Sequence, residues 1–599
     1  MGGIIGKLSF DSNEVLAPTV FDRMLDASSG KRAEVRGVFT APGIALGWCG
    51  VRDGLVAPIL ETCVGASDAG NIRVVADSQL INAGELRDTL ERGGHRFAMR
   101  TDAELVAHAY DRWGTRAFER LRGPFACAVW DGTNRRLVLA RDHVGVRGLY
   151  FAVLQGHGIV FASDVRALLC DPGVARDWCP NGIDTYLALG YIPAPLTAFR
   201  HISKLQPAHY LLVEGRRLHL EEYWDFSTPR TATRSGSVTA IAAGLRTAVR
   251  HELSHREHEA VLYSGGTASS ALLAVTPATL GIPITVHTEQ DPAELARSGK
   301  AASLLGRTRE LEELAKPVSS LVETVAAASG EPFADPSAVT QLAIYTATAR
   351  HKDVALAGHG AAILWAGRDR RALRSWFAPE SGDESAATHE NAVWEDQRRR
   401  SIYTRGFAWK VRDTNPFSWH LERWRSRADD APPDRVRYVN ARTLLPDNVL
   451  AIAANTANAA GITLRFPFLD YQMTELAMQT PVMVSRRGGS AMYVIRELFA
   501  SRLPRRLRPP VFHQPVRNRW LAPLLTALVP SVLLGPRFDG RDIVSKPTLR
   551  RLWNEHLTAR TDHSRRLWSL LMLEFWFREF IDGDAAAEPL EYAVLKKAS

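Results

Sequence analysis

The stretch Ala260–Ala274, AVLYSGGTASSALLA, decides the fold of the second half of this chain. Its apolar start predicts a short buried strand, and a helix-like segment follows from about Ser269. The two glycines between them let backbone amides approach an anion, and the positive end of the following helix attracts one. We interpret the segment as a loop that holds phosphate or another anion; a plain glycine-rich turn capped by serine is the alternative. The residues of this predicted anion loop are Ser264, Gly265, Gly266, Thr267, Ser269 and Ser270.

The pattern around this loop predicts a parallel sheet. Ile282–His287 and Val354–Ala357 are further apolar runs of strand length, and helix-length segments separate them. Such alternation is typical of strands joined by crossover helices. From Trp394 onward the pattern is mainly helical, and the polar segment Ala378–Asn391 is predicted to be a lid-like loop.

The first two hundred residues show a different pattern of apolar runs and turns. Leu137–Ala140, Gly148–Ala152 and Gly158–Ala162 predict strands, while Leu86–Leu90 and Asp102–Trp113 predict helices. These elements indicate a layered α/β or β-rich domain. The polar, turn-rich segment 227–238 reads as a linker, and a chain of 599 residues has ample length for two domains.

Composition narrows the class of protein. The net charge of +9 is dispersed over the chain and no nucleic-acid recognition motif accompanies it, so we expect no nucleic-acid partner. No apolar run is long enough to span a membrane, and the N-terminus lacks the pattern of a secretion signal. The five cysteines show neither a CxxC pair nor a histidine at metal-ligand spacing, which favours reduced thiols. We therefore expect a cytoplasmic protein.

Short segments in register along the chain carry a resemblance to a known family. They are 74–82, 85–87, 101–104, 121–126 with 130–131, 139–142 with Gly145 and 149–150, 161–164, 191–195, 264–266, 358–361, 445–448 and 465–470. Together they resemble the asparagine synthetase B family of glutamine-dependent amidotransferases, whose second domain is an ATP pyrophosphatase. The length and the altered first domain look most like the branch with lasso-peptide cyclases and β-lactam synthetases.

The resemblance implies the fold and its division. The fold class is α/β, with an α+β glutaminase-like domain of the Ntn-hydrolase type over residues 1–226. A doubly wound parallel-sheet domain of the PP-loop ATP pyrophosphatase type follows over residues 238–599 and ends in helices.

The glutaminase motifs depart from the family pattern. The family places a cysteine nucleophile directly after the initiator methionine, and this position is Gly2. The family's Asn-Gly-Glu substrate segment reads Asp77-Ser78-Gln79. We therefore predict that the chain lacks glutaminase activity, a loss that the lasso-cyclase and β-lactam branches share.

The nucleotide motifs depart as well. The family uses ATP and Mg²⁺, and its anion loop carries an aspartate where this chain has Ala268. The second motif, Gly-x-Gly-x-Asp-Glu in the family, is Gly358–Ile363, GHGAAI, and a third acidic motif reads 454–465, ANTANAAGITLR. Mg²⁺ needs oxygen ligands that alanine and isoleucine do not supply. No lysine stands between Lys410 and Lys546, so the family's late lysine is absent too, with Arg496 or Arg508 as the available charges. The favoured interpretation is that no ATP or Mg²⁺ is required.

The second motif keeps one group that can move a proton. Gly358 and Gly360 flank His359, whose side chain has an unperturbed pKa near neutrality. Because ligands bind at strand ends in α/β sheets, we predict His359 as a general base or acid; a histidine that only fills space is the alternative. Glu331 or a carboxylate of the segment 380–390 is a candidate partner.

Three hypotheses follow. The first is an enzyme of bacterial specialised metabolism that joins an amine and an acyl group without adenylation, with a small molecule or peptide in an inter-domain pocket. The second is an ATP-dependent amide or lactam synthetase with replacement Mg²⁺ ligands such as Glu331 or Asp335. The third is a non-catalytic partner protein. Whether the chain forms a homodimer is left open.

Overall fold

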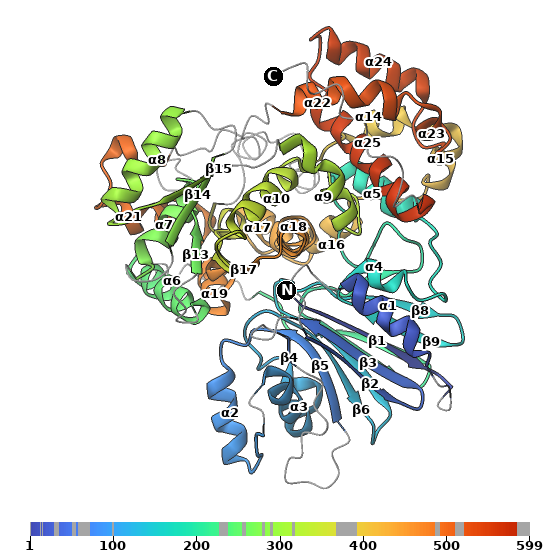
Figure 1. Cartoon of the computed structure of the whole chain (residues 1–599), viewed down its shortest axis with the longest axis vertical. Coiled ribbons are helices and arrows are strands. Elements are labelled where there is room, and N and C mark those ends of the chain that lie inside the picture. The colour runs from blue at the N-terminus through green and yellow to red at the C-terminus, as the bar shows by residue number, and fades with distance from the viewer. Residues whose placement is uncertain are drawn as a thin grey trace.

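The computed structural model describes most of the chain in two parts. It covers residues 2–11, 14, 16–28, 35–50, 56–57, 72–98, 101–226, 238–253, 259–277, 282–287, 292–313, 318–366, 392–485, 492–509 and 520–583. Residues 227–237 of the predicted linker 227–238 and the predicted lid Ala378–Asn391 lie outside the described residues, and Val238 already begins helix α6 (Val238–Glu252). Figure 1 shows the two parts, with the N-terminus between them.

The first part contains two six-stranded antiparallel sheets. Sheet A has the order β10 (Ser203–Lys204), β8 (Tyr150–Leu154), β9 (Gly158–Ala162), β1 (Gly3–Ser9), β3 (Ile44–Gly50), β2 (Val35–Ala41). Sheet B has the order β12 (Arg217–Glu222), β11 (His209–Glu214), β7 (Arg136–Arg141), β6 (Phe125–Asp131), β5 (Ile72–Ser78), β4 (Val56–Ala57). The helices of this part are α1 (Pro18–Ser28), α2 (Ala83–Arg92), α3 (Asp102–Trp113) and α4 (Val165–Leu168). Helix α5 (Pro180–Leu189) packs instead among the C-terminal helices, where Tyr186 donates to the Ser569 carbonyl (Figure 1).

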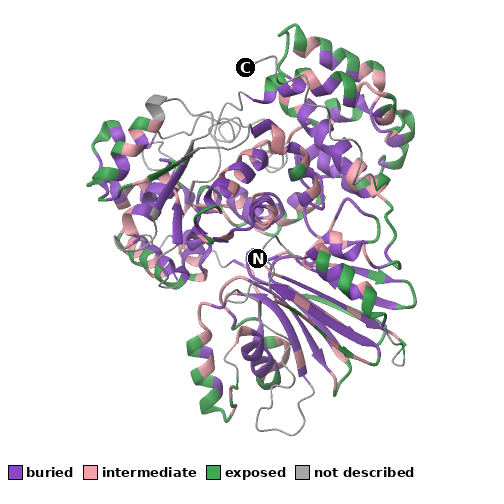
Figure 2. Ribbon diagram, viewed as in Figure 1, coloured by how far each residue is buried: buried purple, intermediate pink, exposed green. Residues whose placement is uncertain are grey.

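Side chains along each strand point alternately to the two faces of its sheet, so these elements pack in layers. On β1, Ile4 belongs to the core between the sheets, whereas Ile5 packs with Phe21 and Met24 of α1. The outer face of sheet B packs against α2 and α3 in a separate core. The order is therefore helix, sheet, sheet, helix. The inner strands of both sheets are buried, whereas the edge strands β2 and β12 are largely exposed (Figure 2).

The second part is built on a parallel sheet. Sheet C has the order β15 (Glu310–Glu313), β14 (Ile282–His287), β13 (Glu259–Leu262), β16 (Val354–Leu356), β17 (Thr463–Arg465), with every pair parallel. From β13, the next strands in the chain, β14 and β15, are added on one side of the sheet, and β16 and β17 are added on the other side. The order in which strands are added therefore reverses between β13 and β16. In an open α/β sheet, ligands bind at the carboxyl ends of the strands at such a reversal.

Helices cover sheet C and continue to the end of the described chain. Those around the sheet are α6 (Val238–Glu252), α7 (Thr267–Val275), α8 (Pro292–Leu304), α9 (Val322–Ala328), α10 (Ser337–Thr348), α11 (Ala361–Ala366), α17 (Pro432–Arg442), α18 (Ala451–Ala460), α19 (Tyr471–Gln479), α20 (Val482–Ser485) and α21 (Tyr493–Ala500). The remaining helices are α14 (Asp396–Ile402), α15 (Arg405–Lys410), α16 (Ser418–Arg425), α22 (Leu521–Leu528), α23 (Pro536–Asp539), α24 (Lys546–Leu557) and α25 (Ser564–Trp576). Short 3-10 or π turns are η1 (Gly114–Ala117), η2 (Val318–Leu321), η3 (Leu445–Leu450), η4 (Pro467–Leu469), η6 (Arg505–Leu507), η7 (Val529–Leu533) and η8 (Phe577–Asp582).

The structure confirms the predicted fold class. The antiparallel layered first part and the parallel second part are both present, and α3, β9 and β14 have the bounds that the sequence predicts. The helix after the anion loop begins at Thr267, two residues before the predicted start. None of the helices within the described ranges is both long and apolar enough to cross a membrane.

Candidate active site

The two predicted loops meet at the reversal of sheet C. β13 leads into the anion loop and β16 leads into Gly358–Gly360, and these two strands are neighbours. A Cβ atom at Gly358 would lie 2.8 Å from the Cβ of Ala268, so the loops touch. The structure thus brings the predicted residues to the edge where ligands bind in this class of fold.

The anion loop needs glycine at its first turn. Gly265 has φ of 75°, and a Cβ there would lie 2.6 Å from the Cβ of Ser298. The Ser264 hydroxyl accepts a hydrogen bond from Gly266 N at 3.3 Å, and Ser264 is exposed. Ser269 Oγ donates to Gly266 O and lies 3.3 Å from Ser264 Oγ. The loop therefore presents a hydroxyl and a helix start to an incoming group.

Thr267 and Ser270 differ in how far a ligand can reach them. Thr267 is the first residue of α7 and is half-buried, whereas Ser270 is fully buried. Thr267 is thus the better placed of the two to contact a ligand.

The donor set at these loops suits an anion better than Mg²⁺. Ala268 is half-buried beside the loop, and Ala361, Ala362 and Ile363 begin α11 after the second loop. None of these side chains offers the oxygen ligands that Mg²⁺ takes. Within the described ranges, no group of three or more His, Cys, Asp or Glu side chains could hold a metal ion. The residues present at the loops therefore do not fit the magnesium ion that the family resemblance implies, although they fit phosphate or carboxylate oxygens.

His359 lies at the end of β16 with one ring nitrogen paired and one not. Nε2 lies 3.3 Å from the hydroxyl oxygen of Tyr345 on α10. The ring packs edge-on against Phe466 at 5.6 Å between centroids. Nδ1 is buried with no hydrogen-bond partner among the described residues. Burial lowers the pKa of His359 to about 4, so the imidazole is neutral at pH 7 and can accept a proton.

The proposed carboxylate partners of His359 bond elsewhere. Glu331 is buried between the two parts of the molecule, where it accepts from Lys204 Nζ at 2.7 Å and from Ala198 N at 3.1 Å. Asp335, predicted only as a replacement Mg²⁺ ligand, accepts from Ser337 N at the start of α10. The segment 380–390 lies outside the described residues. Tyr345, not a carboxylate, is therefore the partner that the structure gives His359.

The two arginines that the sequence offers in place of the late lysine differ in their surroundings. Arg508 donates to the carbonyls of Leu503 and Ala500, and so serves the local backbone. Arg496 lies on α21, which packs against α7, and its Nη1 is buried without a hydrogen-bond partner in the described part of the chain. Burial lowers the pKa of Arg496, with Arg508 adding to the effect.

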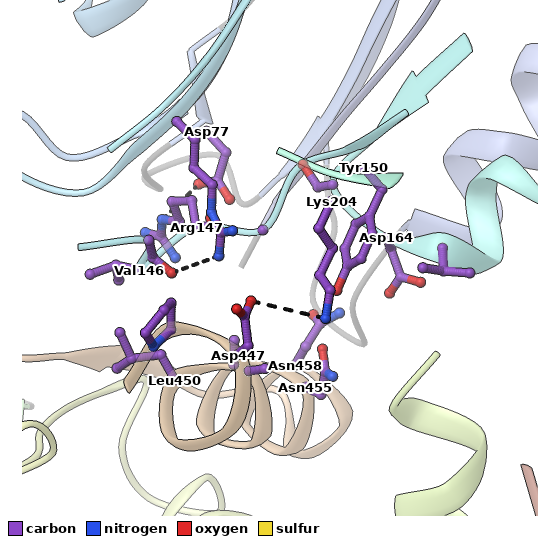
Figure 3. A pocket seen from close by; sticks show the side chains of 18 of the residues that line it. Asp77, Val146, Arg147, Tyr150, Asp164, Lys204, Asp447, Leu450, Asn455 and Asn458 are labelled. Carbon is purple, nitrogen blue, oxygen red and sulfur yellow. Dashed lines mark hydrogen bonds and ion pairs between the residues drawn. The ribbon is translucent and has the colours of Figure 1, made fainter. Parts of the chain in front are cut away.

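A second site lies between the two parts of the molecule (Figure 3). It is a pocket of about 80 Å³. The first part of the chain contributes Gly2, Ser28, Asp77, Arg141, Gly145, Val146, Arg147, Gly148, Tyr150, Ser163, Asp164, Val165 and Lys204, and the second contributes Ser329, Pro446, Asp447, Leu450, Ala451, Ala454, Asn455 and Asn458. None of the residues of the anion loop or of Gly358–Gly360 lines it.

Charged side chains in this pocket are paired with one another. Lys204 Nζ lies 4.0 Å from Asp447 in addition to its bond to Glu331, and Arg147 Nε lies 3.3 Å from Asp77 Oδ1. Burial raises the pKa of Asp77 while Arg147 opposes the shift, and burial likewise raises the pKa of Glu331 against the effect of Lys204. The contacts of Lys204 with Glu331 and Asp447 join the two parts, whereas the Arg147–Asp77 pair lies within the first part.

Gly2 occupies the place in this pocket where the family resemblance puts a nucleophile. The cysteines within the described ranges are Cys49, Cys127, Cys170 and Cys179, and none lines the pocket. Cys49, on the strand beside Gly3, is buried and donates to the Gly3 carbonyl.

Part of the third altered motif lines this pocket. Ala454, Asn455 and Asn458 on α18 belong to its lining, whereas Thr463–Arg465 form β17, which pairs with β16 beside the predicted loops. The segment 454–465 therefore connects the inter-domain pocket with the edge of sheet C where the loops lie.

Sequence reasoning missed the charged residues Lys204 and Asp447 of this pocket and the partner of His359. Asp447 lies in one of the family-like segments, 445–448, which could have marked it. Lys204 lies 127 residues from Glu331 and no local pattern joins them. Tyr345 is four residues after Gln341 on α10, a helical spacing that could have shown a polar line on a buried helix.

Comparisons with known proteins agree with the two-part structure. Residues 1–224 match a model of the glutamine amidotransferase domain, and residues 240–578 match a model of asparagine synthase. A putative glutamine-hydrolysing asparagine synthetase of Mycobacterium tuberculosis is 26% identical over 564 residues, covering 85% of this chain and 84% of its own length.

Two further relatives are more distant or shorter matches. Asparagine synthetase 1 of Bacillus subtilis is 22% identical, covering 87% of both chains. The amidase chyE of Penicillium rubens is 29% identical over 208 residues, which is 34% of this chain and 30% of the amidase.

Proposed function

This chain belongs to the asparagine synthase family, and we propose that it is a divergent member that joins an amine to an acyl group without hydrolysing glutamine and without Mg²⁺-dependent adenylation. The family as a whole forms amides with ATP and Mg²⁺. The proposal keeps the amide-forming reaction class and changes how the acyl group is activated.

The observation that carries the proposal is the placement of His359. A neutral imidazole lies at the reversal of sheet C, in the loop that touches the anion loop, and its Nδ1 has no partner among the described residues. Buried polar atoms in folded proteins are nearly always hydrogen-bonded, so such an atom indicates a ligand or a catalytic role.

The proposed reaction uses an acyl group that arrives already activated. The amine nitrogen attacks the carbonyl carbon, a C–N bond forms, and the bond from that carbon to the leaving group breaks. The leaving group departs with the bonding electron pair, and its negative charge is held at the anion loop. His359 accepts the proton that the nitrogen loses and then passes it to the leaving group or to water.

Two features support activation of the acyl group without Mg²⁺-dependent adenylation. Neither loop at the reversal carries a carboxylate for Mg²⁺, and the position of the family's cysteine nucleophile is Gly2. Both changes remove a group that the family chemistry needs.

An ATP-dependent amide or lactam synthetase is the second candidate. The intact backbone of the anion loop favours it, because Gly265 keeps the left-handed turn that lets amides approach phosphate. This candidate requires replacement oxygen ligands for Mg²⁺.

Calorimetric titration with ATP separates the two candidates. The purified chain is titrated with ATP, with and without Mg²⁺, and with glutamine in parallel. We expect no Mg²⁺-dependent ATP binding and no release of glutamate from glutamine. Micromolar binding that needs Mg²⁺ would favour the synthetase, and glutamate release would refute the loss of glutaminase activity.

A trapping assay tests the amide-forming step itself. Hydroxylamine serves as the amine probe with panels of acyl adenylates, acyl phosphates and acyl thioesters, and hydroxamate is measured. We expect hydroxamate from at least one class and little from the His359→Asn variant. Equal turnover by the two proteins would refute the role of His359.

A further inference from the structure

Behind His359 runs a line of hydrogen bonds along α10. Tyr345 Oη donates to Gln341 Oε1 at 3.1 Å, and Gln341 Nε2 donates to Ser337 Oγ at 3.2 Å. The three side chains are four residues apart on one helix, and Tyr345 is 2% exposed. We call Ser337, Gln341 and Tyr345 the α10 relay.

We propose that the α10 relay fixes the tautomer of His359, so that Nε2 carries the hydrogen and Nδ1 presents a lone pair to the substrate amine. This inference rests on the proposed function. It adds that Tyr345 is a positioning residue and that the site recognises a substrate group with an N–H donor.

The direction of the relay follows from the chemistry of its members. Because the Gln341 amide nitrogen donates to Ser337, the amide oxygen faces Tyr345 and takes the tyrosine hydrogen. The hydroxyl has one hydrogen, so its oxygen is left to accept from His359 Nε2. Burial raises the pKa of Tyr345, which keeps the hydroxyl protonated and the direction fixed.

The tautomer decides which ligands the site recognises. A lone pair on Nδ1 pairs with an N–H or O–H donor and repels a carboxylate oxygen. Phe466 at the ring edge offers no competing donor. A primary amine is the group that satisfies Nδ1 and at the same time needs a proton acceptor when it attacks an acyl carbon.

Nitrogen NMR of the full chain labelled with ¹⁵N-histidine tests the tautomer without substrate. The His359 signals are identified by their loss in His359→Asn. We expect the Nε2–H form in the wild type, and a mixture or the Nδ1–H form in Tyr345→Phe, which keeps the ring and removes the acceptor. An Nδ1–H wild type, or a Tyr345→Phe spectrum identical to the wild type, would overturn the inference.

Gln341→Glu checks the direction of the relay. An ionised carboxylate can only accept, so Tyr345 must donate to it, and the Nε2–H signal is expected to persist. Loss of that signal in Gln341→Glu would contradict the proposed direction. Tyr186→Phe is the matched control, because it removes another buried tyrosine hydroxyl, one that donates to the Ser569 carbonyl, and should leave the His359 spectrum unchanged.

Kinetics separate failure of this inference from failure of the proposed function. With hydroxylamine as the amine, Tyr345→Phe should lower kcat roughly tenfold or more and leave KM for the acyl donor nearly unchanged, because the base is misoriented. If the tautomer shifts as expected but His359→Asn keeps full turnover, the proposed function fails while the relay stands. If His359→Asn is inactive and the Tyr345→Phe spectrum is unchanged, the relay fails while the function stands.

Discussion

At the scale of the residue, the proton-accepting capacity of His359 is set by its surroundings. Burial lowers the pKa of His359 to about 4, so the neutral form dominates above that value. We expect the rate of hydroxamate formation to be lost as pH falls through about 4, in a profile of kcat/KM against pH. Hydroxylamine also loses its nucleophilic form in acid, so the profile is corrected with an uncatalysed reference. A profile without this acid limb would contradict the assignment of His359 as the base.

The size of the His359 contribution can be measured by substitution. Asn keeps a polar side chain of similar size but accepts no proton, so His359→Asn should lower kcat/KM by about 10²- to 10⁴-fold. The control is Ser337→Ala, in which the base is retained and only the far end of the α10 relay is removed; its loss should be smaller. A larger loss in Ser337→Ala than in His359→Asn would show that α10, and not the imidazole, limits turnover.

The contact of the two loops gives a stability prediction at Gly358. A Cβ there would lie 2.8 Å from the Cβ of Ala268, so Gly358→Ala should overpack the site and lower the free energy of unfolding by about 1–3 kcal/mol. Gly84→Ala is the control, because no atom lies within 4 Å of its Cβ and it stands in helix α2. That control should be neutral or stabilising in urea unfolding. Equal effects of the two changes would refute the close contact.

At the scale of the element, the end of helix α6 is tied to the strand that carries the altered substrate segment. Glu252 Oε2 accepts from Gln79 Nε2 at 2.7 Å, directly after β5. Burial raises the pKa of Glu252 to about 7 and Asp470 adds to the shift, while Arg465, the Gln79 hydrogen bond and Arg147 oppose it. The segment Asp77-Ser78-Gln79, which corresponds to the family's glutamine-binding segment, thus contacts the second domain here.

This shift gives a pH dependence with a defined sign. The folded pKa of Glu252 lies above its ordinary value of 4.5, so its contribution to stability is fully present below pH 4.5 and is lost as pH rises through about 7. The loss is on the order of 3 kcal/mol. Glu252→Gln keeps a hydrogen-bond acceptor and should flatten urea-unfolding stability over this window. Glu85→Gln, on the exposed first turn of α2, is the control that should not; a Glu252→Gln profile that matches the wild type would refute the assignment.

Local sequence predicted the elements better than the contacts between them. The apolar run and glycines of 260–266 were sufficient to place β13 and its loop, because strand length and left-handed turns are local properties. The partner of His359 was not predicted, because Tyr345 lies on a different element. That part of segment 454–465 also lines the inter-domain pocket was not predicted for the same reason: its motif is local, but the surface that α18 faces is decided by packing of the two domains.

At the scale of the whole molecule, one buried lysine joins the two domains. Lys204 is the last residue of β10, an edge strand of sheet A, and Glu331 belongs to the second domain. Both side chains are 4% exposed. Removing one member of a buried ion pair leaves an uncompensated charge away from water, which is far more costly than losing a surface pair. The domains are therefore coupled through this bond more strongly than through any exposed pair of similar length.

Lys204→Met tests this coupling. The change leaves Glu331 buried without its cation, and we expect urea unfolding to show a loss of about 3–5 kcal/mol. Adding Glu331→Gln should recover part of that loss, because the stranded charge is then removed. The control is Asp26→Asn, which breaks the exposed pair with Arg36 and should cost less than about 1 kcal/mol. If Lys204→Met costs no more than Asp26→Asn, the pocket between the domains is solvated enough to screen its charges, and the two domains are held by their apolar contacts instead.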